Sequence, residues 1–118
     1  MHGLKEDADL RFLVGRELIQ LALGRYEFQL RFDGEASSSV QCVLRLRSGA
    51  ATKTIRSDHP QESKELACIV GEKVSGVSIT DQGALSIGFA NGCELMLEDS
   101  NESFESYVIW NKGDFLVV

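Results

Sequence analysis

Two stretches of this 118-residue chain share one pattern of apolar residues and glycines at a constant offset of 56. Residues 10–23 read LRFLVGRELIQLAL, and residues 66–79 read LACIVGEKVSGVSI. After one inserted residue the match continues to two turns, Asp-Gly at 33–34 and Asn-Gly at 91–92. The charged residues differ freely between the two stretches. Shared packing positions with divergent surfaces indicate an internal repeat.

We therefore predict a single domain over residues 1–118, in which two related units occupy approximately residues 7–56 and 61–118. Each unit is expected to begin with a short helix, because Gly15 and Gly71 follow a short apolar segment. Glycine accepts the left-handed conformation that ends a helix. These glycines argue against one long helix over residues 10–23. The helices are predicted at about Asp7–Val14 and Gln61–Val70, the second starting near Asp58 and Pro60.

After each glycine the apolar residues alternate with polar ones, which indicates strands with one buried face. In the first unit these are Leu21, Leu23, Phe28, Leu30 and Phe32, and in the second Val77, Ile79, Leu85, Ile87 and Phe89. A third strand is predicted in each unit, at Val40–Leu46, with Cys42 and Leu44 on its buried face, and at Cys93–Leu97. The tails are predicted as a strand at Thr52–Arg56 and a hairpin of Tyr107–Trp110 with Phe115–Val118.

These elements predict an α+β fold that is mostly antiparallel β, because hairpin-length links cannot join parallel neighbours. We expect six to nine strands in a sheet or half-open barrel, two short helices, and internal duplication of an αβββ(β) unit. The order of the strands does not follow from the sequence.

The net charge of −6 is unevenly distributed. Residues 1–56 carry nine Lys/Arg and seven Asp/Glu, whereas residues 57–118 carry three and eleven. The acidic balance argues against nucleic acid as a partner, although the first unit has a modest basic face of Arg25, Arg31, Arg45, Arg47, Lys53 and Arg56. No apolar run reaches the ~18–20 residues that span a bilayer. Together with the absence of a secretory pattern at the N-terminus, this predicts a cytoplasmic protein without membrane contact.

The sequence contains few patterns that indicate a catalytic or metal-binding site. The chain has an odd number of cysteines, Cys42, Cys68 and Cys93, and they lack a CxxC spacing. We therefore expect free thiols buried in the core and no metal site. His2 and His59 are expected to have structural roles. Serines 37, 38 and 39 are expected in a polar loop. We predict neither cofactor nor catalytic residue, and we do not expect an enzyme.

The most unusual segment combines acids with aromatic residues between residues 98 and 110. Such combinations commonly bind Lys- and Arg-rich surfaces, although the same residues suit a solvated loop beside a partly buried aromatic pair. The candidate contacts are Glu94, Glu98, Asp99, Glu102, Glu105, Tyr107 and Trp110.

Three motifs carry a family resemblance: Val70-Gly71, the turn at residues 89–92 (FANG) and the segment at residues 104–109 (FESYVI). With them the chain resembles small uncharacterised bacterial domains, some of which lie beside polymorphic toxins and are considered immunity proteins. The resemblance covers mainly the last 55 residues. It implies a non-enzymatic inhibitor and brings no catalytic residues.

The leading hypothesis is therefore a protein-binding domain of the immunity type, which binds a basic partner such as a toxin through its acidic C-terminal half. One alternative is a small-ligand-binding domain with a pocket between the two repeats. Another is a homodimer joined through exposed strands, in which the basic half of one chain meets the acidic half of the other.

Overall fold

A computed structural model describes residues 11–25, 27–34, 36–40, 43–56, 60–79, 84–97, 107–111 and 114–117. These residues form ten strands and two 3-10 helices, and none of them is in an α-helix. All strand pairs are antiparallel. The predicted antiparallel β character is thus confirmed, but the strands form two open five-stranded sheets and not a single sheet or a half-open barrel.

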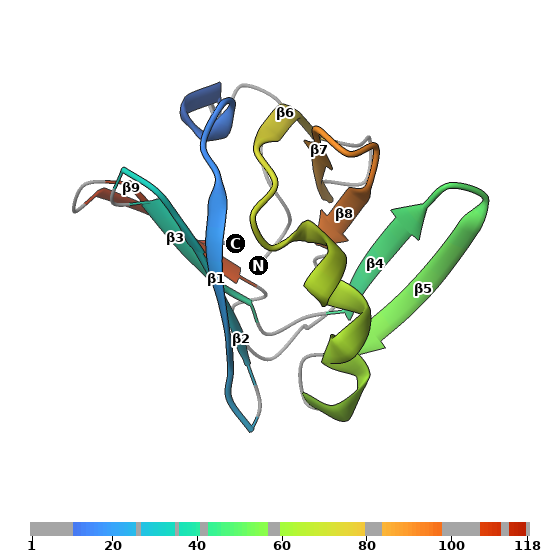
Figure 1. The fold of residues 1–118 in the computed structure, drawn as a ribbon. Coiled ribbons are helices and arrows are strands. Elements are labelled where there is room, and N and C mark those ends of the chain that lie inside the picture. The colour runs from blue at the N-terminus through green and yellow to red at the C-terminus, as the bar shows by residue number, and fades with distance from the viewer. Residues whose placement is uncertain are drawn as a thin grey trace.

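The first sheet has the strand order β1-β2-β3-β9-β10. Its strands are β1 (Leu18–Leu23), β2 (Phe28–Phe32), β3 (Ala36–Val40), β9 (Tyr107–Asn111) and β10 (Asp114–Val117). The predicted C-terminal hairpin is confirmed as the pair β9–β10. Figure 1 shows β1, β2, β3 and β9 side by side, with β1 nearest the second sheet.

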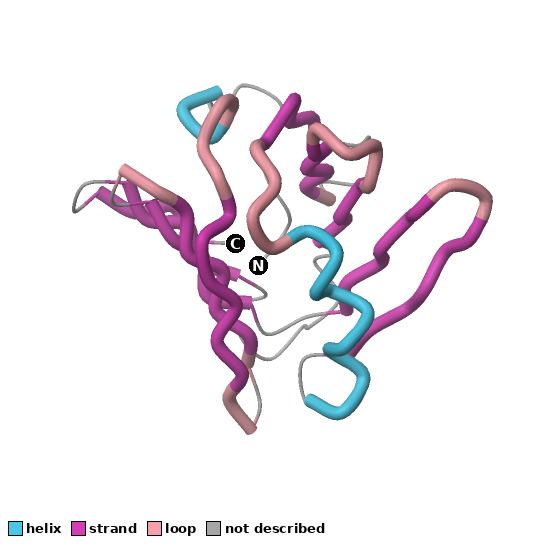
Figure 2. The backbone as a smooth tube through the Cα atoms, in the orientation of Figure 1, coloured by secondary structure: helices cyan, strands magenta, loops and turns pink. Residues whose placement is uncertain are grey.

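The second sheet has the order β5-β4-β8-β7-β6. Its strands are β4 (Val43–Ser48), β5 (Ala51–Arg56), β6 (Val74–Ile79), β7 (Leu85–Phe89) and β8 (Glu94–Leu97). The predicted strands at the end of the first unit and at Cys93–Leu97 are confirmed as β5 and β8. In Figure 2 the β4–β5 hairpin extends away from the rest of the chain, and every β5 residue except Ile55 is exposed.

Each sheet combines strands from both units, and the two sheets do so in the same way. Each contains the first three strands of one unit and the last two strands of the other, so that β3 pairs with β9 and β8 pairs with β4. At the junction, the N–H of Gly15 donates to the carbonyl of Val74 at 2.8 Å, and the N–H of Gly71 donates to that of Leu18 at 2.7 Å. Both bonds involve residues that correspond at the offset of 56.

The α part of the predicted α+β fold is wrong for the described residues, because the two predicted helical segments are 3-10 helices, η1 (Arg11–Leu13) and η2 (Pro60–Ile69). Residues 7–10 of the first predicted helix lie outside the described residues. Residues i and i+3 eclipse in a 3-10 helix, which directs both Leu66 and Ile69 into the core with no exposed surface. Gly15 and Gly71 follow with φ of +87° and +89°, as expected for glycines that end helical turns. The interpretation of residues 10–23 as one helix is excluded, because β1 begins at Leu18.

The predicted strand over Val40–Leu46 is wrong. The chain leaves the first sheet after Val40 and enters the second at Val43. The expected polar loop at Ser37–Ser39 is also wrong, because these serines lie in β3, which is hydrogen-bonded to β2 and β9. Cys42 lies outside the described residues.

One hydrophobic core joins the two sheets and both helices. Phe28 and Leu30 enter it from the first sheet, and Leu44 and Leu95 from the second, all with no exposed surface. The helix η2 contacts both β1 and β5, and it covers one side of the space between the sheets (Figure 1). Among the described residues, the edge strands are β1 and β10 of the first sheet and β5 and β6 of the second.

Candidate functional site

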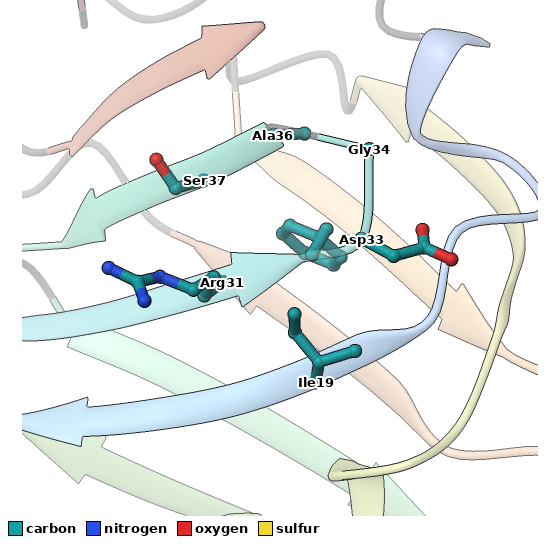
Figure 3. Close-up of a pocket in the computed structure, with 7 residues that line it drawn as sticks. Ile19, Arg31, Asp33, Gly34, Ala36 and Ser37 are labelled. Carbon is teal, nitrogen blue, oxygen red and sulfur yellow. The ribbon is translucent and has the colours of Figure 1, made fainter.

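A shallow pocket of about 290 Å³ lies on the outward face of the first sheet, where β1, β2 and β3 meet the β2–β3 turn. Figure 3 shows Ile19, Arg31 and Ser37 arising from these three neighbouring strands, with Asp33 and Gly34 in the turn. The lining residues are Ile19, Arg31, Phe32, Asp33, Gly34, Ala36 and Ser37.

A β-bulge places Ile19 at this site. The register of β1 against β2 shifts between Leu18 and Gln20, which leaves Ile19 as the extra residue. Leu18 is fully buried, whereas Ile19 is 47% exposed. A bulge twists a strand and changes where its side chains point. The adjacent apolar residues Leu18 and Ile19 break the alternation, and this break is the sequence signal for the bulge that our prediction missed.

The charge in the pocket comes from Arg31. It lies on β2 between the buried residues Leu30 and Phe32, so the pleat directs its side chain outward. No ion pair or side-chain hydrogen bond of the Arg31 guanidinium is found among the described residues. The carboxylate of Asp33 has a local structural role, because its Oδ1 accepts the backbone N–H of Glu17 at 3.2 Å.

The turn beside the pocket is held by Arg16. Its Nε donates to the carbonyl of Phe12 at 2.8 Å, and its Nη1 donates to the carbonyl of Asp33 at 2.9 Å and to that of Gly34. The Asp33-Gly34 turn forms as predicted, with Gly34 at a φ of +71°. The pocket rim is therefore tied to η1.

The predicted contact residues do not form one cluster in the part of the chain that is described. Glu94 lies in β8 of the second sheet and pairs with Arg47 at 2.8 Å. Tyr107 and Trp110 lie in β9 of the first sheet. Trp110 is the register partner of Ser37, which places its backbone one strand from the pocket. Glu98, Asp99, Glu102 and Glu105 lie outside the described residues.

The basic residues of the first unit are divided between the sheets. Arg45 and Arg47 are exposed on β4, as predicted for its outward side, whereas Arg31 is exposed on β2 of the first sheet. The pocket described above differs from the pocket that was expected between the two repeats, because all of its lining residues belong to the first unit.

Cysteine placement differs from the expectation of three core residues. Cys93 is buried, but Cys68 is exposed on η2. Their sulfur atoms lie 3.7 Å apart. Within the described ranges, no three His, Cys, Asp or Glu residues are arranged to hold a metal ion. His2 and His59 lie outside those ranges.

No helix in the described part of the chain is both long and apolar enough to cross a bilayer. The search of curated proteins found no match, and the search of solved structures also found none. A family model matches residues 10–118, which include every described element. The chain therefore belongs to the family of unknown function DUF6188.

Proposed function

We propose that this protein is a non-enzymatic protein-binding domain, and that it takes up an extended segment of a partner along the edge strand β1. The observation that carries the proposal is the exposure of large apolar side chains on this strand: Ile19 is 47% exposed and Leu23 is 52% exposed. The backbone of Leu18 is bonded across the junction to Gly71 and Glu72, so the partner segment is proposed to pair with β1 beyond Leu18. Unpaired backbone groups on an edge strand are a template for an added strand, and neighbouring side-chain sites give selectivity.

The corresponding edge strand β6 supports this assignment by contrast. It has a β-bulge at the matching place, where Ser75 takes the position of Ile19. Ser75 is polar, and Ile79, which corresponds to Leu23, is only partly exposed and packs against the core. The edge strands β1 and β6 thus have matching β-bulges but differ in how much apolar side chain they expose. The exposure on β1 is therefore not required by the backbone fold.

The pocket beside β1 indicates the chemistry of the partner. Arg31 supplies a guanidinium that has no carboxylate partner among the described residues, and Ser37 supplies a hydroxyl. Arginine binds carboxylates through two parallel hydrogen bonds, and Ile19 adds an apolar contact. We therefore propose a partner segment in which an acidic residue alternates with apolar ones.

We propose, as a second protein-binding function, an immunity-type role against a basic toxin. Its candidate contacts lie mostly outside the described residues, and Glu94 already pairs with Arg47. Charge reversal at Glu98, Asp99 and Glu102 should slow association with a cognate toxin and make the rate less sensitive to salt. Unchanged association kinetics would contradict this role.

The β1 proposal can be tested with blocked peptides in which valine alternates with either aspartate or lysine. We expect the aspartate peptide to shift the ¹⁵N-HSQC signals of β1, Arg31 and Ser37, and the lysine peptide to leave them unchanged. Arg31→Glu should weaken binding on the order of tenfold through charge reversal. Ile19→Ser should weaken it about tenfold through loss of apolar contact.

Ser75→Ala is the matched control, because it changes the same bulge position on β6 and should leave affinity unchanged. Equal binding of both peptides, no binding of either, or signal shifts on β6 instead of β1 would overturn the proposal. So would a dimer in light scattering that Ile19→Ser dissociates, because a second copy of the chain would then occupy the edge.

A further inference from the structure

Cys68 and Cys93 come from different elements but face each other. Cys68 lies near the end of η2, and Cys93 directly precedes β8. Their Sγ atoms are 3.7 Å apart, within hydrogen-bonding distance for sulfur. Twenty-four residues separate them in the chain, including β6 and β7. The fold thus joins two thiols that are distant in sequence.

The side chain of Asn91 holds the two cysteine backbones together. Its Nδ2 donates to the carbonyl of Cys68 at 3.0 Å, and its Oδ1 accepts the backbone N–H of Cys93 at 3.1 Å. Asn91 itself lies in a turn in which Gly92 has a φ of +91°. A single amide group therefore fixes the position of one cysteine relative to the other.

Each sulfur has a further polar neighbour. The Sγ of Cys68 lies 3.4 Å from the carbonyl oxygen of Glu65, and the Sγ of Cys93 lies 3.6 Å from the Oγ of Ser48. Each thiol has a single proton, which it can donate to that oxygen or to the other sulfur. Cys68 is exposed to solvent, whereas Cys93 is 5% exposed. One thiol is thus accessible to a reagent, and the other is sheltered behind it. An oxidant therefore meets Cys68 first, and Cys93 is close enough to attack the oxidised sulfur.

We propose that Cys68 and Cys93 form an oxidisable thiol pair, a modification site that closes to an intramolecular disulfide with a hydroperoxide as the oxidant. The thiolate of Cys68 attacks the O–O bond of hydrogen peroxide, which forms a sulfenic acid and releases hydroxide. The sulfur of Cys93 then attacks the sulfur of Cys68. The S–S bond forms, the S–O bond breaks, and the hydroxyl group leaves as water with the proton of Cys93.

The net reaction oxidises two thiols by two electrons and reduces one peroxide to two waters. The sulfur atoms must approach from 3.7 Å to the ~2.05 Å of a disulfide bond. Side-chain rotation can supply a movement of this size, because Asn91 already holds the backbones in place. The bond would link η2 to the β7–β8 turn.

The experiment uses the full chain with Cys42→Ser, so that Cys68 and Cys93 are its only thiols. After treatment with hydrogen peroxide, we expect a mass lower by two hydrogens and a non-reduced peptide that contains both cysteines. The oxidised chain should unfold at a temperature about 10 °C higher, because the link restricts the unfolded chain. Dithiothreitol should reverse both changes.

Two controls separate this site from general oxidation. Cys93→Ser in the same background should yield oxygen adducts on Cys68 or intermolecular dimers, with no internal link. Asn91→Asp loses the donor to the Cys68 carbonyl and should slow closure on the order of tenfold, with circular dichroism verifying the fold. Peptide mapping of the unmutated chain gives an independent check. A Cys68–Cys42 link there, or stable oxygen adducts on Cys68 while Cys93 stays free, would overturn the proposal.

Discussion

Glu17 and Lys73 pair in an isolated antiparallel bridge at the junction of the two sheets. The N–H groups of Leu18 and Val74, one residue further along each chain segment, each donate across this junction to the other unit. All four residues correspond at the offset of 56. The junction is therefore symmetric, because each unit donates one of these backbone hydrogen bonds to the other.

The same carbonyl is satisfied by different side chains in the two units. The carbonyl of Phe12 accepts Nε of Arg16, whereas the carbonyl of Cys68, which corresponds to Phe12, accepts Nδ2 of Asn91. Arg16 also donates to the β2–β3 turn, and Asn91 itself lies in the β7–β8 turn, so both side chains link a 3-10 helix to a turn. The two units thus satisfy the same backbone group with different residues. In the second unit the residue is Asn91, which bonds to the backbones of both Cys68 and Cys93.

Gly15→Ala and Gly71→Ala should destabilise the protein equally. An added Cβ meets no atom within 4 Å at either position, so the cost comes only from a φ near +90°. Left-handed backbone costs a residue with a Cβ about 1–2 kcal/mol, and we expect that loss from each variant in urea unfolding. Gly76→Ala is the control, because Gly76 also has open space but no positive φ. A neutral result for either test variant would contradict the strain argument.

Arg16→Ala should destabilise the fold far more than Arg47→Ala. The half-buried Arg16 donates to three carbonyl groups of η1 and the β2–β3 turn, and its loss should cost about 2–3 kcal/mol. Arg47 and Glu94 form a surface pair with side chains 55% and 27% exposed, so its loss should cost under about 1 kcal/mol. Urea titration of both variants measures the difference. Equal losses would show that the Arg16 bonds add little.

The strand order could not be predicted because apolar alternation does not record which sheet a strand belongs to. Val40 lies in β3 of the first sheet, and Leu44 and Leu46 lie in β4 of the second, yet all three are buried. A strand that crosses a corner between packed sheets keeps facing the same core. Its alternation continues through the crossing, and the sequence therefore suggested one strand where there are two.

The polar sequence of β3 led us to predict a loop where the structure has a strand. Ser37, Ser38 and Ser39 resemble a loop in sequence, but β3 is the middle strand of the first sheet and bonds to neighbours on both sides. Its backbone bonds do not depend on apolar side chains. By contrast, glycines at turns were informative, because a positive φ at Gly15 and Gly71 admits few other residues.

The candidate site was the least predictable part of the molecule. Ile19 and Arg31 lie on neighbouring strands, so their proximity depends on strand pairing and on the bulge in β1. The exposure of Cys68 depends on how η2 lies against the sheets. Leu66 and Ile69, on either side of it, are buried, and apolar neighbours in the sequence therefore suggested burial for Cys68 as well.

Ser38→Ala should leave stability unchanged or raise it by up to about 1 kcal/mol. The hydroxyl of Ser38 is buried, and it has no hydrogen-bond partner in the described part of the chain. A buried polar group without a partner costs free energy, so its removal is favourable. Urea unfolding gives the free-energy change, and Ser37→Ala on the half-exposed side of β3 is the matched control. A loss above about 1 kcal/mol for Ser38→Ala alone would reveal a partner for this hydroxyl.

Cys68 should react with iodoacetamide along a pH profile displaced to high pH. Cys68 is exposed as a residue, but partial burial of its thiol raises the pKa above its ordinary value of 9.0, and the hydrogen bond and charge of Cys93 act in the same direction. The thiolate is the nucleophile, so a raised pKa lowers the rates of alkylation and of attack on peroxide at neutral pH, and both should rise with pH. In the Cys42→Ser background, Cys93→Ser should shift the profile downward, because burial is then the main remaining cause.

The same pKa shift sets the sign of a stability change. The unfolded chain releases the Cys68 proton first as the pH rises past 9.0, while the folded chain retains it. The unfolded state is then favoured, so the free energy of unfolding contributed by this group falls with rising pH. Cys68→Ser should flatten this part of the stability profile. An alkylation midpoint below 9.0, or a profile that Cys93→Ser leaves unmoved, would contradict the coupling of the two thiols.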